Sequence, residues 1–188
     1  RGVCHWGAIL PDGRPYVIDE FVHQYKSIPD SAGEMRVRTK DHGIRRILYT
    51  VADKYSMGMR TDDSSALTRK TLFDDCGIPI TATDHDRVVG WTRCRELLTL
   101  RADGMPGVVI HPRCRRLIRE LSGATSAKHD GEDVDINFAQ DALSSFRYGA
   151  MTLPGPTPFR RPAVPPNAMG RDLATVRDAA SRLPWHFR

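Results

Sequence analysis

The sequence contains no apolar run long enough to cross a bilayer. Its longest uncharged apolar stretches include residues 47–52 and 108–110, whereas a membrane-spanning helix needs about 20 apolar residues. No basic segment followed by an apolar stretch opens the chain, which excludes a secretory signal in the residues given. We therefore expect a soluble protein that is not exported and that has no contact with a membrane.

The cysteine pattern excludes a zinc-finger type of site. The four cysteines, Cys4, Cys76, Cys94 and Cys114, are widely spaced, and no C-x-x-C pair is followed by a second Cys or His pair. We expect small, reduced, buried thiols instead. The sequence also lacks the G-x-x-x-x-G-K-[ST] loop that cradles the phosphates of ATP, so no ATPase site is expected in these residues.

Strong charge of one sign is missing from the first 150 residues. Those residues hold 22 Lys and Arg against 21 Asp and Glu, a net charge of +1, whereas residues 151–188 hold six Arg against two Asp, a net charge of +4. The latter segment also carries seven of the 13 prolines, which exclude a continuous helix or a sheet interior over 154–166. We expect a domain at 1–150 and an extended Pro/Arg-rich tail at 151–188, with a possible helix over 172–183.

The first quarter of the chain predicts a hairpin, a helix and a buried strand. Residues 3–10 and 16–22 are strand-like on either side of a turn, Pro11-Asp-Gly-Arg. Residues 27–43 have a helix-start pattern with a proline in the first turn and a glycine at the end. Residues 44–52 are almost continuously apolar and β-prone, which is typical of a strand covered on both faces. That strand ends at Asp53.

The remaining residues up to about 150 alternate helix and strand. The patterns predict helices at 65–76, closed by Gly77, and then at 86–100, 112–121 and a last segment ending near 149. Short strands are expected at 78–81 and 108–110. Five strands with intervening helices predict an α/β fold, a mixed β-sheet flanked by α-helices on both faces.

Two carboxylates stand out as candidate catalytic residues. Asp53 closes a buried strand and Asp141 lies on the last helix. Ligands bind beyond the carboxyl ends of strands in open α/β sheets, and carboxylates that meet there can hold divalent cations. The alternatives remain open at this point, because an Asp that closes a strand is commonly a helix cap and an Asp in a helix commonly faces water.

Several phrases of the sequence resemble one family over nearly all of residues 1–150. They are the phrases at 12–21, 52–53, 76–79, 83–90, 93–97 and 111–121, and finally Asp141-Ala-Leu with Arg147-Tyr-Gly. In combination they resemble the C-terminal nuclease domain of tailed-bacteriophage terminase large subunits, which has an RNase H-like fold. The family commonly ends with an Asp-His-x-x-Asp-Ala-Leu-Arg-Tyr pattern, and its final Asp matches Asp141.

The resemblance implies a metal site. Asp53 and Asp141 would be catalytic residues and ligands of Mg²⁺ or Mn²⁺, with Asp135 and the carbonyl oxygen of Asn137 as further ligands; Phe138 stands where the family has His. The family's first acidic residue lies on a first strand that has no counterpart here. We expect that strand to lie upstream of Arg1, so that residues 3–10 correspond to the family's second strand and the fragment is inactive if its first ligand is missing.

The resemblance also implies a substrate and partners. It predicts an endonuclease domain that cuts concatemeric viral double-stranded DNA by two-metal hydrolysis, at the procapsid portal in the host cytoplasm. An upstream ATPase domain, the portal and the small terminase subunit would be its partners. Candidate DNA-contacting residues are Arg113, Arg116 and Arg147, although a solvated helix face explains the first two equally well. The alternatives are a non-catalytic DNA- or portal-docking module and another RNase H-like nuclease, such as a junction resolvase.

Overall fold

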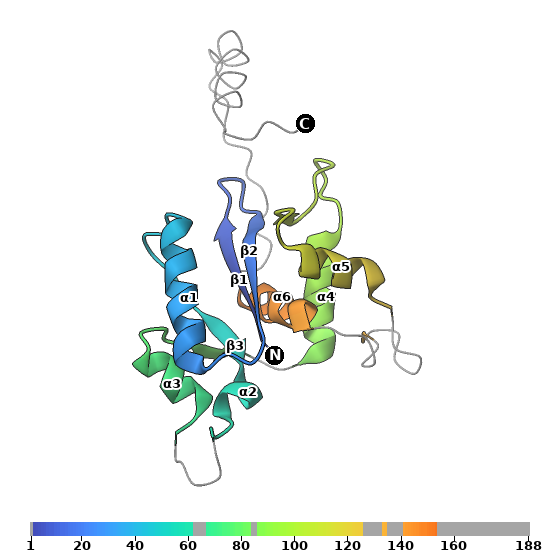
Figure 1. Cartoon of the computed structure of the whole chain (residues 1–188). Helices are drawn as coiled ribbons and strands as arrows, with labels where there is room; N and C mark the ends of the chain where they lie inside the picture. The colour runs from blue at the N-terminus through green and yellow to red at the C-terminus, as the bar shows by residue number, and fades with distance from the viewer. Residues whose placement is uncertain (1, 62–66, 84–85, 126–132, 135–140, 154–188) are drawn as a thin grey trace. The chain divides into compact units, whose positions relative to one another are not determined.

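A long hairpin begins the part of the chain that the structure describes (Figure 1). The structure is a computed structural model, and it describes residues 2–61, 67–83, 86–125, 133–134 and 141–153. Strands β1 (Gly2–Ile9) and β2 (Pro15–His23) pair antiparallel, with a register shift between Trp6 and Gly7. Gly13 in the connecting turn has a φ of 83°, a conformation that favours glycine. The predicted hairpin is confirmed.

The five described strands form two sheets instead of the single sheet expected. Strand β5 (Val109–Ile110) pairs parallel to β2, which gives a mixed sheet of order β1-β2-β5. Strands β3 (Val51–Asp53) and β4 (Thr81–Thr83) pair parallel in a separate sheet. No strand among the described residues pairs with the outer edge of β1 or of β3. The mixed α/β class is confirmed, and the division of its sheet was not predicted.

The segment before β3 differs most from its prediction. Residues 44–50 were expected to form a strand buried on both faces, but the strand begins only at Val51. Ile47, Leu48 and Tyr49 are 53%, 73% and 45% exposed. A strand is buried on both faces only where neighbouring strands and covering helices hold it, and the described residues pair β3 with β4 over three positions alone. The apolar run is therefore left in solvent.

The six described helices follow from recognisable start and stop signals. In α1, Ser27 accepts a hydrogen bond from the backbone N–H of Asp30, and Gly43, with a φ of 65°, lies just beyond its end. Asp86 caps α4 in the same way, through the N–H of Val89. The bounds are α1 Ile28–Asp41, α2 Lys54–Gly58, α3 Arg69–Asp75, α4 Arg87–Leu98, α5 Arg115–Gly123 and α6 Asp141–Thr152.

Helices cover both faces of the hairpin, as predicted. Successive strand residues point to opposite faces: His5 hydrogen-bonds to Ser145 of α6 (2.9 Å), and the Trp6 indole N–H donates to Thr39 of α1 (2.9 Å). The same alternation in β2 sends Asp19 toward α1 and Glu20 toward α5. One face of the hairpin therefore carries Trp6 and Asp19, and the other face carries His5 and Glu20.

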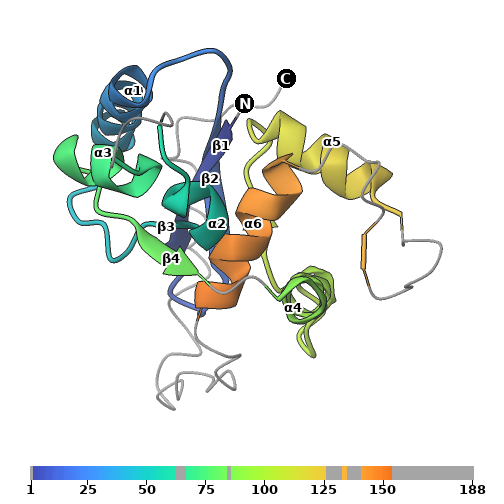
Figure 2. The same ribbon diagram turned by 90° about the horizontal axis from the view of Figure 1, so that it is seen from below.

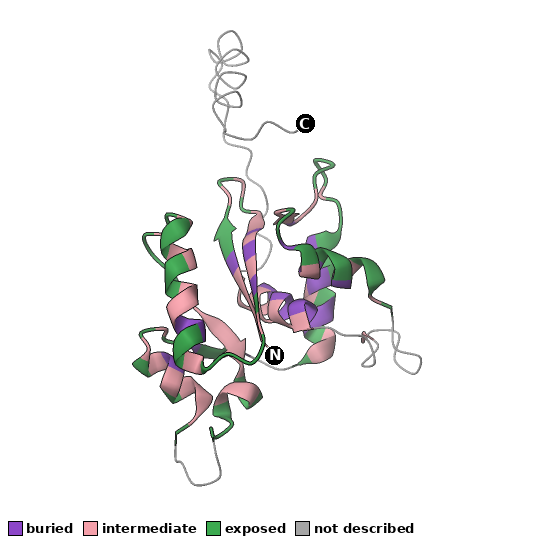
Figure 3. Ribbon diagram, viewed as in Figure 1, coloured by how far each residue is buried: buried purple, intermediate pink, exposed green. Residues whose placement is uncertain are grey.

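The buried side chains form two clusters, one on each sheet. The larger packs β2 and β5 against α4, α5 and α6, with Trp91, Leu117 and Phe146 among its buried members. The smaller packs α1 and α3 against β4, with Ala32, Phe73 and Ile80 buried. Figure 3 shows buried residues concentrated on α6 and α4, whereas the outer turns of α1 are exposed. Helix α6 itself contacts β1, β3 and β4, so it connects the two sheets.

Candidate metal and nucleic-acid site

Asp53 lies where the β3 strand ends and helix α2 begins. Its carboxylate accepts the backbone N–H of Ser56 at 3.0 Å, so it caps α2. This carboxylate also interacts electrostatically with Tyr148 on α6. Burial and this carboxylate raise the pKa of Tyr148 above its ordinary value, which keeps the hydroxyl protonated and available as a donor. The sequence-predicted residue is therefore at a strand end and faces α6.

Asp141 is the first residue of α6 and pairs with an arginine. Its Oδ2 atom lies 3.1 Å from an Nη atom of Arg116 on α5, and its side chain is 39% exposed. The Nε atom of Arg116 donates to Glu120 at 2.7 Å, one turn further along α5. Arg116 thus lies between an exposed carboxylate and a buried one, since the Glu120 side chain is only 5% exposed.

Two buried glutamates hold the ends of α5 and α6 in place. Glu120 accepts the backbone N–H groups of Ala142 and Leu143 at 2.9 and 3.0 Å, at the start of α6. Glu20 of β2 accepts the N–H groups of Arg116 and Leu117, at the start of α5. Burial opposes ionisation of Glu20, but the His5 ring, whose Nε2 atom lies 3.7 Å from Oε2 of Glu20, and the hydrogen bonds from these two N–H groups outweigh it, and the pKa of Glu20 is lowered. Carboxylates satisfy unpaired N–H groups at helix starts, so both glutamates have structural roles.

Helix α6 brings the two predicted aspartates to one side of the molecule. Asp141 and Tyr148 are seven residues apart on α6, which is about two turns and places them on the same helix face. The electrostatic interaction between Tyr148 and Asp53, together with the contact between α6 and β3, places Asp53 near this face. Figure 2 shows α6 running from α5 to the β3–β4 sheet. Residues far apart in sequence therefore converge on one helix.

The donor chemistry of this face fits a hard divalent cation. Mg²⁺ is commonly held by one or two carboxylates, with water and substrate phosphates completing its shell. A cationic guanidinium already sits against Asp141. Within the described ranges no group of three or more His, Cys, Asp or Glu side chains is arranged to hold a metal ion. The other expected ligands, Asp135 and Asn137, lie outside the described residues.

The three predicted DNA-contacting arginines have different surroundings. Arg113 is exposed just before α5, and Arg115 and Arg119 are exposed on that helix, one turn apart. Arg116 is engaged by Glu120 and Asp141. Arg147 is only 1% exposed and lies against the rings of Trp91 and Tyr148. Its guanidinium is covered by the protein, so this arrangement does not favour its predicted contact with DNA.

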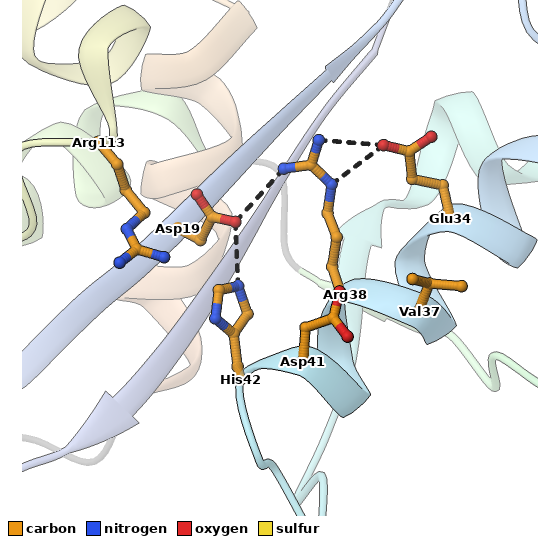
Figure 4. A pocket seen from close by; sticks show the side chains of 7 residues that line it. All are labelled: Asp19, Glu34, Val37, Arg38, Asp41, His42 and Arg113. Atoms are coloured by element: carbon orange, nitrogen blue, oxygen red, sulfur yellow. Dashed lines mark hydrogen bonds and ion pairs between the residues drawn. The ribbon is translucent and has the colours of Figure 1, made fainter.

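A polar cleft of about 520 Å³ lies on the opposite face of the hairpin (Figure 4). Asp19 accepts hydrogen bonds from His42 at 2.9 Å and from Arg38 at 3.3 Å, and Arg38 also pairs with Glu34. These charges neutralise one another and join α1 to β2. The cleft is on the α1 side of the sheet, away from the face that carries Asp141.

The cysteines of the described residues agree with the sequence analysis. All four are free, and Cys94 and Cys114 are 4% and 0% exposed. Burial raises the pKa of each of these two thiols to about 12. They are protonated core side chains at neutral pH, as expected for structural cysteines.

Sequence reasoning missed the acidic partners of Arg116. Glu20 and Glu120 were not singled out, because a Glu in a strand or a helix ordinarily faces water. One signal was present: Glu20 lies inside a strand whose neighbours Val17 and Phe21 are buried. A charged side chain in such a strand indicates a buried partner. The position of that partner is set by the tertiary fold.

Comparisons with known proteins give one structural match. No protein-family model matches the sequence, and no curated protein sequence matches it. Among solved structures, the chain is similar to the g2p (large terminase) nuclease domain from the bacteriophage SPP1, whose structure has bound Mn. The two share 14% identity over 79% of this chain and 84% of that one, with a TM-score of 0.45.

Proposed function

We propose that this chain is a divalent-metal-dependent endonuclease domain of a phage DNA-packaging terminase large subunit. The observation that carries the proposal is the convergence on α6 of the two aspartates that the sequence motifs single out. Asp53 interacts electrostatically with Tyr148 of α6, and Asp141 begins the same helix. The choice of family rests on the resemblance of the motif that contains Asp141-Ala-Leu and Arg147-Tyr.

The residues of this face have distinct roles in the proposed reaction. Asp53 and Asp141 would hold Mg²⁺ or Mn²⁺. A bound ion of this kind lowers the pKa of its water ligand and neutralises charge on the phosphodiester. The N–H of Ser56 orients the Asp53 carboxylate, which also interacts electrostatically with Tyr148. The exposed side chains of Arg115 and Arg119 on α5 would contact phosphates of the duplex, and Arg113 would contact phosphates from the cleft on the α1 side of the hairpin, which it lines.

The test is cleavage of double-stranded DNA with Mg²⁺ or Mn²⁺ by the wild type, Asp53→Asn and Asp141→Asn. Each substitution removes one charge and keeps the side-chain size, and Asn is also a good helix cap at position 53. We expect the cutting rate of each variant to fall by at least about 100-fold, because substitutions around a bound metal ion commonly reduce activity on this scale. Asp75→Asn, an exposed substitution of the same kind on α3, is the matched control. Because the family's first acidic residue has no counterpart in these residues, Mn²⁺ binding by the same proteins is measured beside cutting. Equal cutting together with equal Mn²⁺ binding by all four proteins would refute the assignment.

We further propose that a strand from upstream in the parent polypeptide completes the sheet. The outer edges of β1 and β3 are unpaired within the described residues, α6 contacts both strands, and the apolar segment 47–49 is exposed beside β3. Unpaired edges and exposed apolar side chains are what an added strand would cover. Such a strand would also bring the third carboxylate that the family carries. Hydrogen exchange would show protection of residues 44–50, which precede β3, only when that strand is present.

The proposed partners follow from the same assignment. They are double-stranded viral DNA, an upstream ATPase domain, the portal and the small terminase subunit, at the procapsid in the host cytoplasm. No described helix combines the length and apolar character needed to span a bilayer. Cleavage of Holliday junctions without cleavage of linear duplex would favour a junction resolvase instead.

A non-catalytic docking module is the second candidate function. Two observations favour it: Asp141 forms an ion pair with Arg116, and the described residues hold no three-ligand cluster. That candidate predicts DNA or portal binding that is the same with and without Mn²⁺ and is unchanged in Asp53→Asn. The nuclease predicts that both the added metal and the substitution change the outcome.

A further inference from the structure

Arg116 contacts Asp141, the carboxylate that we propose as a metal ligand. Its Nη atom lies 3.1 Å from Oδ2 of Asp141, a spacing typical of a charge-assisted hydrogen bond. The argument that follows rests on the proposed function, because it concerns the same carboxylate. One carboxylate oxygen cannot serve a guanidinium and a metal ion in the same position.

The two acidic partners of Arg116 hold it unequally. Glu120 is 5% exposed, lies 2.7 Å from the Nε atom of Arg116, and also caps α6 through two backbone N–H groups. Asp141 is 39% exposed and contacts Arg116 through one oxygen at 3.1 Å. A buried carboxylate with three hydrogen bonds is costly to disturb, whereas an exposed ion pair contributes little. Glu120 therefore holds Arg116 in place, and Asp141 is the partner that can release Arg116 and bind a metal ion instead.

We propose that Arg116 is a positioning residue that competes with the divalent cation for Asp141. Without metal, the guanidinium neutralises Asp141 and holds its side chain. When a cation takes Asp141, Arg116 stays on Glu120 and presents its freed N–H groups toward the substrate phosphate. Because the two cations exclude each other, Arg116 lowers the metal affinity of the DNA-free protein, and the metal weakens the Arg116–Asp141 pair by the same factor.

The experiment measures Mn²⁺ binding to the DNA-free chain by the electron paramagnetic resonance signal of the unbound ion. Arg116→Gln removes the positive charge and keeps an N–H donor for Glu120. We expect this variant to bind Mn²⁺ roughly fivefold or more tightly than wild type, the lower end of typical coupling between two ligands. Arg116→Lys retains the charge and should bind as wild type does. Arg46→Gln is the control, since Arg46 is exposed and has no role in the proposed site.

A second measurement separates this role from a purely structural one. In DNA cleavage, Arg116→Gln should lower the Mn²⁺ concentration for half-maximal rate and raise the DNA concentration for half-maximal rate. A purely structural arginine would shift the melting temperature and leave these two constants unchanged or moved in the same direction. A melting curve of each variant reports the fold independently.

The outcomes distinguish this inference from the proposed function. If Asp141→Asn abolishes Mn²⁺ binding and Arg116→Gln binds as wild type does, the competition is overturned and the nuclease assignment stands. If Asp141→Asn leaves Mn²⁺ binding unchanged, the metal site itself is refuted, and the role of Arg116 with it. Tighter binding in Arg116→Gln, with Arg46→Gln unchanged, supports the inference.

Discussion

Glycine 90 allows helices α4 and α6 to pack closely. A Cβ atom built at this position would lie 2.7 and 2.8 Å from Cγ and Cδ of Arg147 and 2.9 Å from Sδ of Met151. The stem of Arg147 has little room to move, because the residue is 1% exposed and its guanidinium is held by the rings of Trp91 and Tyr148. Because Gly90 has no side chain, there is room for Arg147, the neighbour of Tyr148, at this helix crossing.

We predict that Gly90→Ala lowers the free energy of unfolding by about 1–3 kcal/mol, the usual cost of overpacking a core. Urea denaturation followed by tryptophan fluorescence measures this loss. Gly33→Ala is the control: no atom lies within 4 Å of its added Cβ, and Gly33 is inside α1, so helix propensity should raise the stability by up to about 1 kcal/mol. A gain in stability at both positions would contradict the close helix crossing.

Helix α4 is anchored at its first turns by one carboxylate. Asp133 accepts hydrogen bonds from Arg87 Nε and Nη2 at 2.9 and 3.0 Å and from the Trp91 indole N–H at 2.7 Å. Burial opposes the ionisation of Asp133, but the hydrogen bonds, first that of Arg87, outweigh it and lower its pKa. The lowered pKa means that the ionised carboxylate stabilises the folded state.

Asp133→Asn should therefore destabilise the fold in a pH-dependent way. At pH 7 we expect a loss of about 1–3 kcal/mol, the cost of a charge-assisted hydrogen bond to a buried partner. The stabilisation by Asp133 is complete above the unfolded pKa of about 4 and disappears as the pH falls through the lower folded value. Unfolding titrations at pH 7 and pH 3 should thus show a smaller difference between variant and wild type at pH 3. The exposed Asp75→Asn should show no difference at either pH.

The elements that sequence reasoning located well are those fixed by local signals. Helix α1 has its cap at Ser27 and its glycine stop at Gly43, and the hairpin has its turn at Gly13; each signal acts within a few residues. The strand predicted at 44–52 depends on partners elsewhere in the chain, and the structure forms it only at 51–53. An apolar run in the sequence shows that a segment can be buried, but its burial depends on the elements that pack against it.

The candidate site divides in the same way. Asp53 at a strand end could be recognised from the pattern, and Asp141 from the motif around it. The pairing of Asp141 with Arg116, and of Glu120 with the start of α6, depends on how α5 and α6 pack. No spacing in the sequence encodes that packing, so the electrostatic environment of the site became visible only in the structure.

A substitution at Leu48 tests the exposed segment directly. Leu48 is 73% exposed, so Leu48→Lys should change the unfolding free energy of this chain by no more than about 0.5 kcal/mol, as surface substitutions do. Leu117→Ala, at a fully buried residue of α5, should cost about 2–5 kcal/mol in the same assay. If Leu48→Lys cost as much as Leu117→Ala, the segment would be part of a buried strand in solution.

At the scale of the whole molecule, charge is distributed unevenly along the chain. Residues 1–150 are nearly neutral, and the six arginines after residue 150 supply most of the net charge of +5. Long-range attraction to a DNA duplex scales with the phosphates that a protein neutralises. The exposed arginines of α5 and those beyond residue 155 are therefore expected to contribute separately to DNA affinity. The dependence of affinity on salt concentration measures each contribution.

We predict that a chain ending at Gly155 keeps its fold and loses much of its salt-dependent affinity for DNA. All described helices and strands end by Thr152, so its melting temperature should match that of the full chain. Removal of six Arg and two Asp should reduce the slope of log affinity against log salt by up to about 4, since each neutralised phosphate contributes about 0.9. Fluorescence anisotropy with a labelled duplex at several salt concentrations measures the slope, and Arg160→Gln with Arg161→Gln in the full chain should reduce it by about 2. An unchanged slope in both proteins would assign the phosphate contacts to residues 1–155, and Arg119→Gln would then be expected to lower the slope by about 1.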